Sequence, residues 1–287
     1  MDILGSLLTD WLKNALIEGI LNNFNGMFDE INSRVGEIAT QVGATPVDWN
    51  AGVFNMIKNL SDTVILPIAG IVLTFIMCYE LIQMILERNN MAEFDTFNIY
   101  KWVFKTFVAV YILSNTFSIV VGVFELAQNV VNQSAGVITG DLGIELSVDS
   151  LESTLQEMGT GELLVLFAES FILSFAMKAL SLCIFVIVFG RMLEIYMTIS
   201  IAPIPLSTMT NREWGQMGNN YLKSLFALAF QSFLIMVCIA IYAVLLQSIP
   251  TAENIRVAVW SCAGYTLLLG FMLFKTGSIS KSIFGAS

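Results

Sequence analysis

Ionisable side chains inside apolar stretches are the residues of this sequence with the clearest potential for chemistry. Apolar runs of the chain are interrupted at Glu80, Lys105, Glu125, Glu169 and Lys178. A charge at the centre of a bilayer costs about 2.5–3.5 kcal/mol on insertion scales, so each of these side chains should face a bundle interior, a water-filled cavity or another subunit. They are therefore candidate structural or channel residues.

Lys178 is the base that lies deepest within an apolar segment. With a rise of about 1.5 Å per residue, Lys178 lies about 22 Å from Leu163 and Glu80 about 27 Å from Asp62, the first residues of their segments. We hypothesise that Lys178 and Glu80 neutralise each other, within one subunit or across a subunit contact. The alternatives are that Lys178 faces a watery lumen, and that Glu80 and Lys105 extend their charged groups to the membrane interface.

A second group of candidates follows the third apolar segment. Arg191 and Glu194 have the i, i+3 spacing at which two side chains can pair on one helix face. Pro203 and Pro205 cannot both lie inside one regular helix, so we expect the helix to break near Ala202. This stretch predicts a broken or re-entrant segment near Ala202–Pro205.

The sequence offers no familiar catalytic, cofactor or metal site. It contains no histidine, which excludes Ser-His hydrolases and the usual zinc sites. The four cysteines lie in apolar runs without C-x-x-C spacing, and no phosphate-binding G-x-x-x-x-G-K-[ST] motif occurs. We therefore predict a protein that is not an enzyme and that has no catalytic, cofactor-binding or metal-binding residues.

The composition is that of a membrane protein. Of 287 residues, 56% are apolar and 13% charged, with a mean hydropathy of +0.76, whereas soluble domains have roughly a quarter charged residues. The net charge of −10 argues against nonspecific binding of nucleic acid, which requires basic surfaces. Five apolar segments are long enough, or nearly so, to cross about 30 Å of hydrocarbon: Asp62 to Leu86, Lys101 to Val131, Leu163 to Phe189, Leu222 to Leu246 and Val257 to Phe274.

The N-terminal region has a different pattern. From Ile3 to Ile31 apolar residues recur with helical periodicity, but polar residues interrupt them too often for a span. This pattern predicts an amphipathic helix that lies in the membrane interface or packs on a partner helix. A turn at Thr45-Pro46 and a helix cap at Asp48 should follow. We thus expect an extracellular or interfacial region over residues 1–60 and a transmembrane domain over residues 61–287.

Loop charges predict the orientation of this all-α, polytopic bundle. The loop from Asn132 to Glu162 contains six acidic residues and no basic one. Five spans with the N-terminus outside place nearly all basic loops and the C-terminus in the cytoplasm. A sixth span at Ile195–Leu206 would move later basic residues outside, so Gly190–Met209 is predicted to be re-entrant or a kinked extension of the third span.

Several stretches resemble one family. They are RMLEIY at Arg191–Tyr196, IAPIPLS at Ile201–Ser207, Trp214-Gly215 and YLKSLFALAFQ at Tyr221–Gln231. Together they resemble the TrbL family, the polytopic inner-membrane subunit of type IV secretion machines that is equivalent to the sixth product of the VirB operon. GMFDEINSRVGEIATQVGATP and ILPIAGIVLTFIMCYELIQMI are similar to the version found in conjugative elements of Gram-positive Firmicutes.

The resemblance, which extends over essentially the whole chain, implies a function by association. Members are subunits of a DNA-translocating channel and work with separate ATPases and a coupling protein, with five spans and a cytoplasmic C-terminus. Trp214 matches the central tryptophan region of the family, and Ala202-Pro203 matches its broken segment; neither is catalytic.

We therefore expect a homo-oligomeric channel scaffold in the cytoplasmic membrane, in contact with other conjugation subunits and lipids. A transient contact with translocated single-stranded DNA is compatible with this role. The alternatives are a secondary transporter, which would need a second broken segment, and another oligomeric membrane pore.

Overall fold

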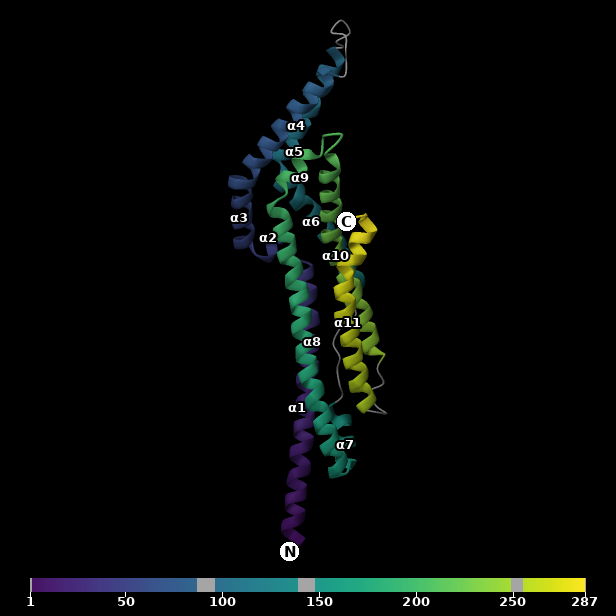
Figure 1. The fold of residues 1–287 in the computed structure, drawn as a ribbon. Helices are drawn as coiled ribbons and strands as arrows, with labels where there is room; N and C mark the ends of the chain where they lie inside the picture. Colours follow the sequence, from purple (N-terminus) through teal and green to yellow (C-terminus); the bar gives the residue numbers. More distant parts are fainter. Residues whose placement is uncertain (1, 87–95, 139–147, 249–254, 287) are drawn as a thin grey trace. The chain divides into compact units, whose positions relative to one another are not determined.

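The structure is a computed structural model that describes residues 2–86, 96–138, 148–248 and 255–286 (Figure 1). All regular elements in these ranges are helices, which confirms the predicted all-α fold. Their bounds are α1 Asp2–Val42, α2 Pro46–Trp49, α3 Ala51–Leu60, the π-helical turn η1 Ser61–Ile65, α4 Leu66–Leu86, α5 Thr96–Ser114, α6 Thr116–Ile138, α7 Val148–Glu157, α8 Thr160–Ser200, α9 Pro203–Thr208, α10 Gly215–Gln247 and α11 Ile255–Phe284.

Four helices of the described residues are long and apolar enough to cross a membrane. They are Ala51–Leu86, Thr160–Ser200, Gly215–Gln247 and Trp260–Phe284. A fifth candidate is the pair Phe97–Ser114 and Thr116–Ser134, which is bent by 67°. The prediction of about five membrane helices is therefore confirmed.

The second predicted segment, Lys101–Val131, falls on two helices with a bend between them, because α5 ends at Ser114 and α6 begins at Thr116. The Asn115 side-chain amide donates to the Tyr111 carbonyl at 2.8 Å, and Thr116 Oγ1 donates to the Leu113 carbonyl at 2.8 Å. Side chains that bind carbonyls of the preceding turn bend helices in this way.

The predicted break near Ala202 is confirmed. Helix α8 ends at Ser200, and α9 begins with Pro203 at its first turn. Proline is tolerated there because its missing N–H group would have no acceptor within the helix. Pro205 falls in the same short helix, so a new helix start accommodates both prolines.

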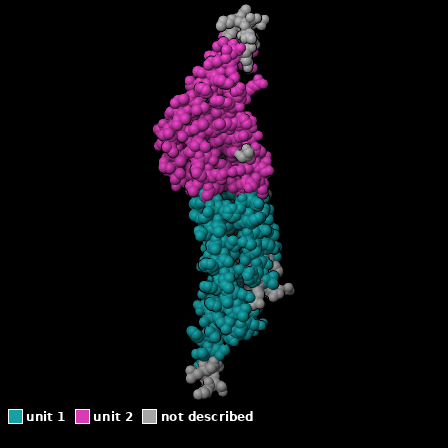
Figure 2. All heavy atoms as spheres, viewed as in Figure 1, with its two compact units in different colours: residues 1–42, 134–189, 235–275 teal, residues 43–133, 190–234, 276–287 magenta. Residues whose placement is uncertain are grey.

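The chain folds into two compact units (Figure 2). Unit 1 comprises residues 1–42, 134–189 and 235–275, and unit 2 comprises residues 43–133, 190–234 and 276–287. This division follows compactness alone. The predicted boundary at residue 60, between an extracellular or interfacial region and a transmembrane domain, falls within the helix Ala51–Leu86. That boundary stays a prediction.

In unit 1, the amphipathic N-terminal helix packs against other helices. Helix α1 extends to Val42, beyond the predicted end at Ile31. Its buried side chains recur at helical spacing: Leu16, Ile17, Ile20, Phe24, Met27, Ile38 and Val42. Lys13 Nζ donates to the Gln156 carbonyl of α7 at 2.7 Å, and Asn23 Nδ2 donates to Ser170 Oγ of α8 at 3.0 Å.

The expected turn at Thr45-Pro46 is present, but the predicted cap residue is wrong. Thr45 is the N-cap of α2, and its Oγ1 accepts the Asp48 backbone N–H at 3.1 Å. Asp48 is the third helical residue, and its carboxylate in turn accepts the Thr45 hydroxyl at 2.6 Å. Thr45, and not Asp48, is therefore the cap residue of α2.

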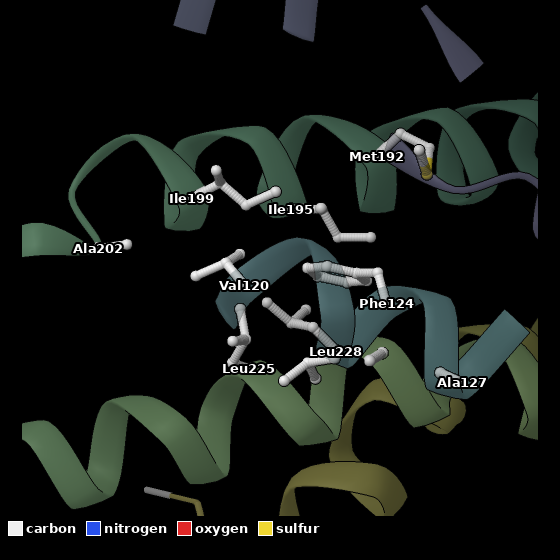
Figure 3. Packing of buried hydrophobic residues seen from close by; sticks show 11 residues of the cluster. Val120, Phe124, Ala127, Met192, Ile195, Ile199, Ala202, Leu225 and Leu228 are labelled. Atoms are coloured by element: carbon white, nitrogen blue, oxygen red, sulfur yellow. The ribbon is translucent and has the colours of Figure 1, made fainter. Parts of the chain in front are cut away.

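Unit 2 is built around two apolar clusters. In one, shown in Figure 3, α6 lies between α8 and α10. It includes Val120, Phe124, Met192, Ile195, Ile199, Ala202, Leu225 and Leu228. The other joins α4 and α5 through Ala69, Leu73, Ile76, Met77, Ala109 and Leu113, with Ile204 of α9 packed against it. The two clusters position the broken segment between α8 and α10.

A glycine permits close contact between the start of α10 and α9. A Cβ at Gly218 would lie 2.7 Å from the Pro205 carbonyl oxygen and 2.9 Å from the Met209 Cα. Both are backbone atoms, which cannot rotate away as a side chain can. Glycine at this position therefore allows the two segments to approach.

We expect Gly218→Ala to destabilise the protein by about 1–3 kcal/mol, because the new methyl group overpacks this contact. The measurement is the apparent Tm of the purified protein in detergent. Gly122→Ala in α6 is the control, since no atom lies within 4 Å of its added Cβ. The control should have an unchanged or higher Tm, and an equal loss in both variants would refute the explanation.

Candidate functional site

A partly buried polar cluster joins the turn before α10 to two helices of unit 2. Glu80 of α4 accepts a hydrogen bond from Lys105 Nζ of α5, with which it forms an ion pair. The same oxygen, Oε1, accepts a hydrogen bond of 2.8 Å from Asn211 Nδ2. We call Glu80, Lys105 and Asn211 the Glu80 cluster.

Asn211 also shapes the turn that precedes α10. Its Oδ1 accepts the backbone N–H groups of Glu213 and Trp214, each at 2.8 Å, while its carbonyl accepts the Gly215 N–H at 2.9 Å. The residue is 7% exposed. One side chain therefore satisfies free N–H groups at a helix start and binds the carboxylate of Glu80.

Trp214 lies beside the cluster in a stack of aromatic rings. Its ring centroid is 6.0 Å from that of Phe75 and 6.5 Å from that of Tyr79, both on α4. Trp214 is 42% exposed, so the stack combines an apolar body with a solvent- or lipid-accessible edge. The role of the predicted Trp214 is therefore packing of the turn against α4.

The expected pairing of Arg191 with Glu194 is wrong. Arg191 Nη2 donates to Ser232 Oγ of α10 at 2.7 Å, whereas Glu194 Oε1 accepts from Lys281 Nζ of α11 at 3.2 Å. Arg191 is 5% exposed, and its Nε and Nη1 have no hydrogen-bond partner among the described residues. The hydrogen bonds of the two side chains thus connect α8 to different helices, and between Arg191 and Glu194 only an electrostatic attraction without direct contact remains.

Within one chain, Glu80 pairs with Lys105 and not with Lys178 as hypothesised. A Glu80–Lys178 pair across a subunit contact stays a hypothesis. Glu80 has Lys105 and Asn211 as partners within unit 2, whereas Lys178 belongs to unit 1. Lys178 is exposed on α8, on a face that also presents Phe175 and Leu182. Glu80 and Lys105 form an ion pair. The interpretation that their charged groups extend to the membrane interface stays a prediction.

The partners that the sequence did not indicate come from distant elements. Asn211, Ser232 and Lys281 are far along the chain from the residues they bind, and spacing alone contains no signal for such contacts. The position of Asn211 before the start of α10 could have indicated a helix cap, although not its bond to Glu80. Within the described ranges, no group of three or more carboxylates or thiols is placed to hold a metal ion.

We expect a measurable coupling energy between Glu80 and Lys105, of about 1 kcal/mol or more, because the two charges are in contact and partly buried. A double-mutant cycle with Glu80→Gln and Lys105→Gln, read as the free energy of unfolding in mixed micelles, measures it. The matched cycle with Lys178→Gln in place of Lys105→Gln should give a coupling near zero. The reverse ranking would restore the Glu80–Lys178 pair.

The comparisons with known proteins agree with this architecture. The family model described as TrbL/VirB6 plasmid conjugal transfer like protein matches residues 31–203. That stretch is more than half of the chain and includes Glu80, Lys105, Arg191 and the break at Ala202. No curated protein and no solved structure matches. With its apolar helices, its broken segment and this match, the chain belongs to the TrbL/VirB6 family of plasmid conjugal transfer-like proteins.

Proposed function

We propose that this multi-pass membrane component of conjugal transfer is a non-enzymatic channel scaffold that acts as a homo-oligomer. It would support the passage of DNA or protein across the cytoplasmic membrane while separate ATPases and a coupling protein drive transfer. The family match supports a conjugation component that associates with other subunits of the machine. The oligomeric scaffold is supported by the surface of helix α8.

The exposed apolar surface of α8 is longer than a bilayer can cover. From Leu164 to Met197 this helix spans about 50 Å, whereas the hydrocarbon core is about 30 Å thick. Its exposed apolar side chains include Leu164, Phe171, Phe175, Leu182, Leu193 and Met197, each at least 49% exposed. Roughly 20 Å of this surface therefore lies beyond the hydrocarbon, where contiguous apolar surface indicates protein contact.

A second copy of the chain is the partner that this surface suits best. Helices α4 and α11 also expose apolar residues, among them Ile71 and Phe271, so a neighbouring copy offers a matching surface. Closed rings of identical subunits are a common way to bury such surface. In that arrangement Lys178 would face a subunit contact or a watery lumen, either of which avoids the cost of a lysine in lipid.

The charge of the loops supports an orientation with the N-terminus outside and the C-terminus in the cytoplasm. The six acidic residues between Asn132 and Glu162 belong outside, and the basic residues Arg88, Lys101 and Lys105 belong inside. Residues 87–95 and 139–147 of these loops lie outside the described residues.

The alternative of a secondary transporter has one observation in its favour. The bend at Asn115 is a second broken helix in addition to the one at Ala202, and transporters use matched breaks. A transporter would however need no long apolar surface outside the bilayer. The match to a conjugal transfer family and the exposed apolar surface of α8 therefore favour the channel scaffold over the transporter.

The orientation predicts opposite labelling of two introduced cysteines in a cysteine-free background. Ser150→Cys should react with an impermeant thiol reagent in whole cells because the proposed orientation puts the acidic segment Asn132–Glu162 outside. Asn90→Cys should react only after the cells are opened. The mass shift of the labelled protein is the readout. Labelling of Asn90→Cys alone in whole cells would overturn the orientation.

The scaffold predicts that the N-terminal helix is needed for assembly. Deletion of Met1–Asn25 should leave the protein in the membrane fraction but abolish DNA transfer in a conjugative host. Because the deletion also removes buried contacts to α8, Leu8→Gln/Trp11→Gln is the sharper variant, since both side chains are 69% exposed. It should reduce transfer and crosslinked oligomers at unchanged protein level, whereas Asn14→Ala should not. Normal transfer by the truncated protein would contradict the proposal.

A further inference from the structure

Beside the Glu80 cluster lies an open pocket of about 320 Å³. It is bounded by the C-terminal part of α4, the first turns of α5 and the turn before α10, and its lining includes Lys101, Trp102 and Arg212. All of these residues belong to unit 2. Neither the conjugation function nor the packing of the broken segment accounts for it.

The pocket has an excess of positive charge. Lys105 is neutralised by Glu80, which leaves the cations of Lys101 and Arg212, both on exposed residues, without an ion-pair partner among the described residues. The nearby carboxylate of Glu213 accepts a hydrogen bond of 3.3 Å from Gln83 and is not part of the lining. Two such cations in one pocket attract a phosphate group.

An apolar surface begins next to this pocket. Phe97, Tyr100, Phe104 and Phe107 lie on one face of α5, and each is at least 66% exposed. Lys101 is on the same helix at the edge of that face, because it follows Phe97 by one turn. A ligand that contacts both parts must have a phosphate head and an apolar tail.

Anionic phospholipid meets this requirement better than single-stranded DNA. Helix α5 is half of an apolar pair that qualifies as a membrane span, so its exposed rings face hydrocarbon rather than bases. DNA-binding grooves also need a series of cations along the strand, and this chain has a net charge of −10. Basic pockets between membrane helices, with tryptophan at the interface, are typical headgroup sites.

We propose that this pocket binds the headgroup phosphate of an anionic phospholipid through Lys101 and Arg212, with the acyl chains along the aromatic face of α5. The proposal needs only the membrane location of the protein and is independent of the scaffold function.

The test is native mass spectrometry of delipidated, full-length protein titrated with phosphatidylglycerol or phosphatidylcholine. The wild-type protein should retain phosphatidylglycerol in preference to phosphatidylcholine, and Lys101→Gln/Arg212→Gln should bind it at least about tenfold more weakly. Lys58→Gln/Lys223→Gln, which removes the same charge from exposed positions of unit 2, should bind like the wild type. Equal affinity for the two lipids, or equal losses in both double variants, would overturn the proposal.

Two further arms separate the sources of phosphate. Millimolar inorganic phosphate should not displace the lipid, and full displacement would mean an anion site without a lipid role. Displacement by oligo-dT, lost in Lys101→Gln/Arg212→Gln, would assign the pocket to DNA instead. If Lys101→Gln/Arg212→Gln fails to fold, the variant Lys101→Arg/Arg212→Lys replaces it, because it keeps both positive charges. It should retain the preference for phosphatidylglycerol. Loss of that preference would contradict a site that recognises the charge of the lipid.

Discussion

Every backbone N–H and carbonyl group inside a membrane must find its partner within the protein, and this structure depends on how that requirement is met where a helix is interrupted. The chain breaks at Ala202 because two prolines follow, and α10 begins only at Gly215. The N–H groups at this new helix start are bound by Asn211, which is itself fixed by Glu80. The side chain of Asn211 thus satisfies N–H groups that have no acceptor within α10.

The same requirement links the carboxylate of Glu80 to the start of α10 in unit 2. Glu80 is held by a cation from α5 and an amide from the turn, so three segments share one carboxylate. Breaking such a group would leave a partly buried charge without compensation, which is more costly than the loss of the hydrogen bond itself. Gly218 and the aromatic stack at Trp214 then fix the turn by packing.

The surface of the chain points to function through association. Helix α8 exposes apolar residues over more length than a bilayer covers, and α1 carries a short run of exposed Leu7, Leu8 and Trp11 near its start. Interactions of this kind are made with other proteins or lipids, in agreement with a family of conjugal transfer components. In the proposed lipid site, Lys101 and Arg212 would add a charged contact at the edge of the exposed aromatic face of α5.

Local properties of the chain were enough to predict the helical fold, the approximate positions of the membrane helices, the break at Ala202 and the family. Apolar length, proline geometry and short patterns all act within a few turns of one helix, so they can be read along the chain. The bend at Asn115, the partner of Glu80 and the separate partners of Arg191 and Glu194 could not be predicted in this way. They depend on which distant helices come into contact, because a side chain pairs with the counter-charge that packing brings nearest. Lys105 and Lys178 are both bases within apolar segments, and it is the packing of α5 against α4 that brings Lys105 to Glu80.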